Sequence, residues 1–311
     1  MKRTGQIACV TGASGMVGNK IVQRLVSHGY KVRALSRSKY FDDPDVELFR
    51  GGLEDEEVLK SFLSNAHLLF HCAAELYDES KMWDVNVLGT EQLLSIVKES
   101  NIQYLCYLSS AGVVGRTNIK WVDEKTICKP QNAYEQSKWA AEQLVAGGID
   151  GCRIVILRPT NVVDEKRPGA LALPIRGSFS NRLKVFIKGG ECAHIVHAED
   201  VADAAMYFVS RPFNTPRCFF VSCDYEKLNT FAGLWALYRT IENNRPVDSV
   251  RPVPHLPLIV PHILRQLRRG KGNRGDIRYS SEKLMSEGFK FHLGAEGAVK
   301  QIISTLGPKQ L

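Results

Sequence analysis

The fold of this chain is decided by residues 6–29, "QIACVTGASGMVGNKIVQRLVSHG". The first part, "QIACVTG", is short, apolar and ends in turn residues, which is typical of a buried β-strand. The part from Met16 to Gly29 has the spacing of an amphipathic helix, and a glycine can end such a helix at its C-terminus. The stretch therefore predicts a strand, a tight turn and a helix in succession.

The turn carries three glycines at three-residue intervals, Gly12, Gly15 and Gly18. Glycine permits positive φ and close approach of the backbone to a pyrophosphate, while the helix N-terminus offers free N–H groups and a favourable dipole. The spacing alone is a weak signal, but a first strand–helix junction is the context that the motif requires. It predicts a dinucleotide phosphate site. The alternative is a tight turn that only packs the helix on the strand.

The same alternation continues outward from this stretch. Further short apolar runs predict strands at 30–36, 46–51, 67–74, 102–110 and 152–159. Amphipathic segments between them predict helices at 55–65, 80–100 and 132–148. Strands that alternate with helices indicate an α/β fold with right-handed crossovers, so we expect a Rossmann-type doubly wound parallel sheet.

The regular alternation of predicted strands and helices ends after Pro159. Residues 160–192 read as irregular, a helix is predicted at 198–210 and an apolar strand at 217–224, and the Pro-rich segment 251–263 follows later. We predict an NAD(P)-binding Rossmann domain from 1–162 with 195–225. The remaining residues, 163–194 with 226–311, are predicted to form a smaller, irregular C-terminal substrate region.

The composition of the 311 residues is that of a globular protein, with 44% hydrophobic and 24% charged residues. No run of about 18 apolar residues occurs, so no membrane span is predicted. The start of the chain does not resemble a signal peptide, and none of the eight cysteines form C-x-x-C. We therefore expect reduced thiols, no metal site and a cytoplasmic location.

The net charge is +8, and the densest basic run is "LRQLRRGKGNRGDIR" at 264–278. Such a run is usually a solvated surface, but it can also form the phosphate-binding edge of a ligand site. No RNP, zinc-finger or helix-turn-helix pattern accompanies the charge, so we expect a small-molecule substrate and no nucleic-acid partner.

The end of the second predicted strand bears on the choice of cofactor. An acidic residue there would bind the ribose hydroxyls of NAD, but this chain has "RALSRSK", with Arg37 at the turn and Lys39 close by. A guanidinium suits a 2′-phosphate, so NADP(H) is favoured and NAD(H) stays possible. The alternative is that Arg37 is only a surface residue.

Three Tyr–Lys pairs have the i, i+4 spacing that places a phenol beside an ammonium on a helix: Tyr77 with Lys81, Tyr134 with Lys138, and Tyr279 with Lys283. Spacing alone does not choose among them. The second pair follows the fifth predicted strand, whose end carries Ser110 at the edge where open α/β sheets bind ligands.

Seven motifs in order along the first two-thirds of the chain are similar to those of one family: "TGASGMVG", "HCAA" at 71–74, "NVLGT" at 86–90, "LSSAGVVG" at 108–115, "YEQSK" at 134–138, "LRPTNV" at 157–162 and "HAEDVADA" at 197–204. Together they resemble the extended short-chain dehydrogenase/reductase family, which includes NAD(P)-dependent nucleotide-sugar epimerases, dehydratases and ketoreductases.

The resemblance implies that Tyr134 is the acid/base, Lys138 its partner and Ser110, rather than Ser109, the hydroxyl that binds the reacting oxygen. A neighbouring ammonium should lower the pKa of the phenol, which is near 10 when free. Asn161 resembles a substrate-side residue, as do Ser110 and Tyr134. The positions that correspond to cofactor contacts are Gly12, Ser14, Gly15, Met16, Val17, Gly18, Arg37, Leu53, Ala73, Tyr134, Lys138 and Pro159.

The chain also departs from the family pattern. Gly52 stands where the family often has an Asp that binds adenine, and Ala193 stands where nucleotide-sugar epimerases often carry an Arg for the diphosphate. A nucleotide sugar would need other cations, for which Arg176, Arg182, Lys184 and the 274–278 segment are available.

The resemblance therefore leaves three functions open. The first is hydride transfer on a nucleotide-activated sugar, as a ketoreductase or an epimerase. The second is reduction or oxidation of apolar substrates such as hydroxysteroids or flavonols, favoured by Ala193 and the apolar "PHLPLIVPHIL" at 254–264. The third, a cofactor-sensing regulator, is disfavoured because Ser, Tyr and Lys are all present. The family also implies a homodimer through the helices at 80–100 and 132–147.

Overall fold

The computed structural model describes residues 5–37, 43–251, 253–269, 273 and 275–306. Lys39, and Arg274 of the basic run, lie outside these residues. The chain divides into two compact units. Unit 1 contains Met1–Gly115, Ile127–Arg158 and Val201–Phe219, and unit 2 contains Arg116–Thr126, Pro159–Asp200 and Phe220–Leu311.

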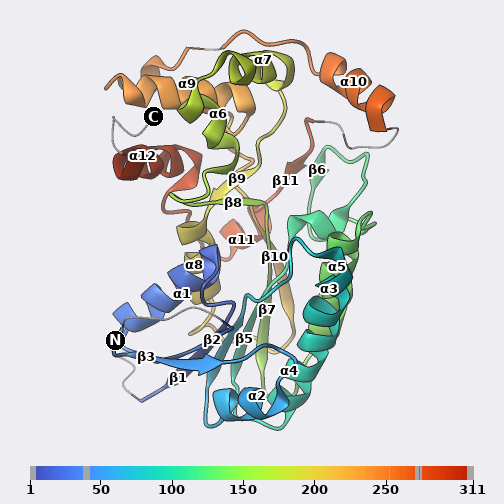
Figure 1. Ribbon diagram of the computed structural model, residues 1–311, viewed down its shortest axis with the longest axis vertical. Coiled ribbons are helices and arrows are strands. Elements are labelled where there is room, and N and C mark those ends of the chain that lie inside the picture. Colours follow the sequence, from blue (N-terminus) through green and yellow to red (C-terminus); the bar gives the residue numbers. More distant parts are fainter. Residues whose placement is uncertain (1–4, 38–42, 252, 270–272, 274, 307–311) are drawn as a thin grey trace. The chain divides into compact units, whose positions relative to one another are not determined.

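A seven-stranded sheet organises unit 1, in the order β3-β2-β1-β4-β5-β7-β10 (Figure 1). The paired strands from β3 to β7 are all parallel. The strands are β1 (Ile7–Thr11), β2 (Lys31–Ser36), β3 (Val46–Arg50), β4 (Leu68–His71), β5 (Tyr104–Leu108), β7 (Arg153–Pro159) and β10 (Arg217–Val221). Each lies within a predicted strand, so the predicted Rossmann-type α/β fold is confirmed.

The chain order reverses between β1 and β4, because β2 and β3 lie on one side of β1 and the later strands on the other. In open α/β sheets a ligand binds outside the carboxyl ends of the strands at this point. The segments that follow β1 and β4, at Gly12 and Ala73, therefore mark the expected site.

Helices cover both faces of the sheet. One face carries α2 (Glu56–Leu63), α4 (Gly89–Lys98) and α5 (Ala133–Ala146), whose apolar sides form a buried core with the strands. The other face carries α1 (Met16–Ser27) and α8 (Ala198–Tyr207), which are joined by an Arg24–Asp203 ion pair of 2.6 Å. The helix predicted at 80–100 consists of α3 (Glu79–Trp83), a π-helical turn η1 (Asp84–Leu88) and α4.

Unit 2 has its own buried core, formed by α9 (Phe231–Glu242), α12 (Gly294–Leu306) and the short strands β8 (Asn161–Val163) and β9 (Ile195–His197). It also contains α6 (Ala172–Arg176), α7 (Phe179–Lys188), α10 (Ile259–Arg269), α11 (Glu282–Ser286) and the paired strands β6 (Trp121–Val122) and β11 (Arg278–Tyr279). Short 3-10 turns complete the order: η2 (Ala111–Val114), η3 (Gly169–Leu171) and η4 (Val247–Ser249).

The expectation that 160–192 is irregular was wrong at α7. Its ten residues form a helix with Ser178 as the N-cap, whose side chain accepts a hydrogen bond from the N–H of Asn181. An amphipathic helix is predicted from apolar residues that face the core, but several apolar residues of α7 lie on its exposed side. The predicted assignment of 1–162 with 195–225 to the cofactor, and of the other residues to the substrate, stays a prediction. The compact units differ from it by placing 116–126, 159–162, 195–200 and 220–225 in unit 2.

Candidate functional site

The glycine turn after β1 is shaped by close backbone contacts. Gly12 has φ of +63°, and a side chain there would begin 2.6 Å from the amide nitrogen of Ala73. A side chain at Gly18 would begin 2.2 Å from the carbonyl oxygen of Gly12. Only glycine fits these two positions, which keep the turn, the end of β4 and the start of α1 in contact.

The N-terminus of α1 has backbone N–H groups that are available to a ligand. Its N-cap is Gly15, and no side chain caps the first turn. Ser14 is exposed, Met16 is half-buried and Val17 is buried. A helix N-terminus without a side-chain cap, behind a turn whose glycines allow close approach, fits the pyrophosphate of a dinucleotide.

A buried hydrogen-bonded chain fixes the ends of β1 and β4. Nδ1 of His71 lies 2.7 Å from the Thr11 hydroxyl, and Nε2 lies 3.0 Å from the Thr90 hydroxyl. The Thr11 hydroxyl also accepts the N–H of Ala73 at 3.2 Å. Burial, and then the charge of Lys138, lower the pKa of His71 to about 3, so its ring is neutral at physiological pH.

Ser110 and Tyr134 meet at the carboxyl end of β5. Ser110 follows β5, caps η2 by accepting the N–H of Gly112 at 3.0 Å, and is hydrogen-bonded to the Tyr134 side chain. Burial raises the pKa of Tyr134, and the bond with Ser110 lowers it only in part. The expected lowering by the ammonium of Lys138 is therefore wrong for the chain without cofactor, because desolvation of the phenolate outweighs its partners.

Lys138 lies one turn after Tyr134 on α5 and is 1% exposed. Its Nζ donates to the carbonyl oxygen of Leu108 at 2.7 Å and lies 4.4 Å from the centre of the Tyr107 ring. Burial lowers the pKa of Lys138 to about 8, against the opposing effects of Cys72 and Glu142. The ammonium is thus held at the end of β5 by the strand that also positions Ser110.

A third residue on this face of α5 was not anticipated from the sequence. Glu142 lies one turn after Lys138 and forms a buried ion pair of 2.5 Å with Arg158 of β7. Its other oxygen accepts the hydroxyl of Ser109 at 2.5 Å. Ser109 is thereby bound within the core, whereas Ser110 is the hydroxyl bonded to Tyr134. The i, i+4, i+8 series of Tyr134, Lys138 and Glu142 was the signal available in the sequence.

The π-helical turn supports the loop after β4. The Asn86 side chain accepts the N–H of Glu75 at 2.7 Å and donates to the Glu75 carbonyl at 3.1 Å and to the Ser137 hydroxyl at 2.9 Å. The Glu75 carboxylate accepts three backbone N–H groups from residues 76–78, and these bonds, with the more distant Arg37 charge, lower its pKa. π-Helical turns of this kind occur frequently at functional sites.

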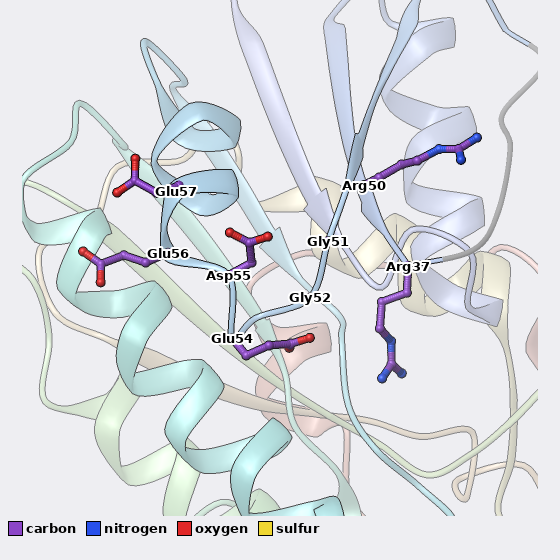
Figure 2. A pocket seen from close by; sticks show the side chains of 8 residues that line it. All are labelled: Arg37, Arg50, Gly51, Gly52, Glu54, Asp55, Glu56 and Glu57. Atoms are coloured by element: carbon purple, nitrogen blue, oxygen red, sulfur yellow. The ribbon is translucent and has the colours of Figure 1, made fainter.

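An open pocket of about 660 Å³ lies beyond the ends of β2 and β3. Figure 2 shows the Arg37 side chain at one side of it, and Glu54 beside Gly52, while Arg50 points away from both. A side chain at Gly52 would begin 2.1 Å from Oε2 of Glu54, so the Glu54 carboxylate occupies that space. Leu53 is 4% exposed and belongs to the core of the sheet, where it leaves little surface for a base.

Two predicted residues belong to unit 2. Pro159 ends β7 and is buried, and Asn161 begins β8, where its side-chain amide donates to the carbonyl of Ala193 at 2.8 Å. Ala193 itself is 1% exposed in the core of that unit.

The two other Tyr–Lys pairs have different surroundings. Tyr77 is 82% exposed, and Lys81 forms a surface ion pair with Asp78 at 3.0 Å. Tyr279 lies in β11 and Lys283 in α11, so they do not share a helix. Among the described residues, no group of three or more His, Cys, Asp or Glu side chains could hold a metal ion.

No helix in the described part of the chain is both long and apolar enough to cross a membrane. All eight cysteines are free thiols.

Comparisons with known proteins agree with this geometry. The human sterol-4-alpha-carboxylate 3-dehydrogenase, decarboxylating, is 27% identical over 195 residues, which are 58% of this chain and 51% of that protein. A candidate UDP-glucose 4-epimerase of Methanocaldococcus jannaschii is 26% identical over 215 residues, 63% of this chain and 70% of that protein. The chain spans only 51% to 59% of the length of the human protein and several other relatives that it matches.

Among solved structures, a short-chain dehydrogenase/reductase superfamily protein of Agrobacterium tumefaciens with bound NAD has a TM-score of 0.73. It is 19% identical and covers 96% of each chain, a likeness that supports the fold. The family model described as "NAD dependent epimerase/dehydratase family" matches residues 8–219, which include the glycine turn, Ser110, Tyr134 and Lys138. The chain therefore belongs to the NAD dependent epimerase/dehydratase family, the extended short-chain dehydrogenases/reductases, as its motifs had predicted.

Proposed function

We propose that this chain catalyses reversible hydride transfer at a carbon that bears a hydroxyl or keto oxygen, with Tyr134 as the acid/base. The observation that carries the proposal is the Tyr134–Ser110 hydrogen bond at the end of β5, one helical turn from the buried Lys138. When bound, the nicotinamide of NAD(P) supplies or accepts the hydride.

The chain's own residues handle the proton. In reduction, Tyr134 donates its phenolic proton to the substrate oxygen as that oxygen gains negative charge, and in oxidation it takes the proton back. Ser110 donates a hydrogen bond to the same oxygen and fixes its position beside the phenol. Burial raises the pKa of Tyr134 in the chain alone, so we propose that the ammonium of Lys138 favours the phenolate only when cofactor and substrate are bound.

The test is Tyr134→Phe, with Tyr77→Phe as the matched control because Tyr77 has the same Tyr–Lys spacing on an exposed surface. Turnover should fall by about 10²–10⁴-fold in Tyr134→Phe, the range that general acid–base catalysis contributes. Cofactor affinity, measured by fluorescence titration, should change little in either variant. An active Tyr134→Phe protein would remove the assignment.

We infer a preference for NADP(H) over NAD(H) from the end of β2. Arg37 borders the pocket there, and the chain has no acidic residue at the strand end. Glu54 favours the opposite, because its carboxylate would repel a 2′-phosphate placed near Gly52. The guanidinium is the group suited to bidentate binding of phosphate, so we give it the greater weight.

Arg37→Ala and Arg50→Ala test this preference, since both residues border the pocket but Arg50 points away from Glu54 (Figure 2). Arg37→Ala should weaken NADP⁺ binding by about tenfold or more and NAD⁺ binding by less than about threefold, while Arg50→Ala changes both little. Equal losses for the two cofactors in Arg37→Ala would refute the preference.

For the substrate we propose a nucleotide-activated sugar, supported by the similarity to a candidate UDP-glucose 4-epimerase over 70% of that protein's length. In this proposal Asn161 contacts the substrate. A second candidate is an apolar substrate of the hydroxysteroid or flavonol kind, supported by the buried Ala193 in place of a cation and by the similarity to a sterol dehydrogenase.

Thermal shift with UDP-, GDP- and dTDP-sugars and with a sterol separates the two, because a ligand that binds the native state raises its apparent stability. Stabilisation by a sterol and by none of the sugars would replace the first candidate with the second.

We also propose a homodimer in a reducing, cytoplasm-like compartment. The helices from Glu79 to Lys98 and from Ala133 to Ala146 expose Trp83, Leu88 and Leu144, and large exposed apolar side chains mark interaction surfaces when they gather. Multi-angle light scattering should give twice the mass of 34.8 kDa, and Trp83→Glu should reduce it to one copy. A wild-type monomer would contradict the dimer. The free cysteines support the compartment.

A further inference from the structure

The positive charge of this protein is concentrated in two segments of unit 2. Residues 166–190 and 249–275 contain twelve of the chain's 41 Lys and Arg residues and none of its 33 acidic residues. The remaining 29 basic and 33 acidic residues give the rest of the chain a net charge of −4, so these two segments account for the entire excess of +8.

Each segment contains a helix that turns an apolar side outward. In α7, Phe179, Leu183 and Phe186 lie at i, i+4 and i+7 and are 83%, 48% and 43% exposed. Their helix is anchored by its opposite side, where Asn181 and Val185 are buried and Val185 packs against Trp235 of α9.

The second helix, α10, also has apolar side chains on its exposed side. Ile259, Ile263, Leu264 and Leu267 are 58%, 50%, 45% and 79% exposed. At about 100° per residue, these side chains and Val260 span an arc of about 140°. The sequence of this helix also contains Arg265, Arg268 and Arg269.

The two helices are neighbours in unit 2. They contact each other, and the N–H of Leu256, just before α10, donates to the carbonyl of Phe186 in α7 at 2.8 Å. Figure 1 shows α7 and α10 at the same end of unit 2. We call the exposed residues Phe179, Leu183, Phe186, Ile263, Leu264 and Leu267 the α7/α10 surface; Arg182 and Lys184 are exposed beside it on α7.

We propose that the α7/α10 surface binds the face of an anionic lipid membrane. The apolar side chains enter the boundary between headgroups and acyl chains, and the flanking Lys and Arg residues bind the lipid phosphates, as in peripheral proteins anchored by amphipathic helices. A contact between two copies of this surface is disfavoured, because it would bring two strongly positive segments together without an acidic residue to offset them.

The test of this docking measures vesicle binding without turnover, so its result does not depend on which substrate or reaction the protein has. The full-length protein is sedimented with vesicles of POPC alone and of POPC with roughly 30% POPG, at about 0.1 M and about 0.5 M NaCl. Binding to the POPG vesicles should be at least about tenfold tighter than to POPC alone, and the higher salt should weaken it.

Three exposed apolar residues provide the variants. Leu267→Glu and Phe179→Glu should each weaken binding by about tenfold or more, because they place a carboxylate in the membrane interface. Ile127→Glu is the matched control, since Ile127 is 74% exposed but belongs to unit 1, and it should bind within about twofold of wild type. Circular dichroism melting curves verify that all variants are folded.

Three results would overturn the proposal. The first is no sedimentation with POPG vesicles. The second is an equal loss in Ile127→Glu, which would show that any apolar residue on the surface is sufficient. The third is a combination of two findings: wild type does not bind vesicles, and Leu267→Glu has a lower molecular mass in light scattering than wild type. That combination would assign the surface to self-association.

Discussion

Replacing Lys138 by methionine should remove activity and, at the same time, remove a pH-dependent penalty on stability. The ammonium is 1% exposed, and burial lowers its pKa from 10.5 to about 8. At about 1.4 kcal/mol per pKa unit, this difference corresponds to about 3 kcal/mol of unfolding free energy. The side chain is almost fully buried, so screening by solvent does not reduce the figure.

The sign follows from proton binding. Between pH 8 and pH 10.5 the unfolded chain keeps a proton on Lys138 that the folded chain has released, so rising pH stabilises the folded state. Below pH 8 the full penalty is present, and above pH 10.5 it is absent. Lys138→Met has no such penalty at any pH. Its loss of the hydrogen bond to Leu108 shifts its stability by a nearly constant amount of about 1–3 kcal/mol.

The measurement is urea unfolding of both proteins, followed by tryptophan fluorescence at about pH 7, 9 and 10.5. The stability of Lys138→Met minus that of wild type should fall by about 3 kcal/mol across this range. Titrating groups that do not interact with Lys138 are shared and cancel in the difference. Lys60→Met is the control, because Glu56 and Glu57 raise the pKa of the exposed Lys60, so alkali relieves no penalty there. A difference that stays flat with pH would refute the burial argument.

Three further predictions concern neighbouring residues. Ser110→Ala should lower kcat by about 10²-fold, since it removes one donor to the reacting oxygen, whereas Ser109→Ala should chiefly lower the melting temperature; a reversed pattern would exchange their roles. Gly18→Ala should cost about 1–3 kcal/mol in urea unfolding and weaken cofactor binding, because its methyl group would meet the Gly12 carbonyl; unchanged values would mean that the turn can shift. The pKa of His71 is lowered to about 3, so as the pH falls below 6.5 the unfolded chain binds a proton at His71 and the folded chain does not. Acid should therefore destabilise wild type by up to about 5 kcal/mol more than His71→Asn. Parallel curves of stability against pH for the two proteins would contradict a neutral buried ring.

The sheet was predictable from the sequence because its strands are short apolar runs between clear turns. Every predicted strand from 6–12 to 217–224 contains an observed one. The glycine turn was predictable for the same reason, since Gly12 and Gly18 occupy positions that no other residue fits.

The surroundings of the site were not predictable, because they depend on burial. Spacing places Lys138 beside Tyr134, but only the packing of α5 on β5 shows that Lys138 is desolvated and that burial raises the pKa of Tyr134. The bond from Ser109 to Glu142 joins residues 33 positions apart, and no local pattern indicates it. In α7 the apolar residues that normally reveal a helix by facing the core are partly turned to solvent.

The π-helical turn of Asp84–Leu88 changes which residues of the helix from α3 to α4 share a face. In an uninterrupted α-helix Trp83 and Val87 would lie on one face, yet Trp83 is 52% exposed and Val87 is 7% exposed. On the buried side, both the fourth and the fifth residues after Met82, Asn86 and Val87, face inward. The turn therefore behaves as a one-residue insertion, and deleting a residue within it would rotate Trp83 inward by about 100° relative to α4. Sequence alignments of this segment need a gap at 84–88 wherever a relative has a regular helix.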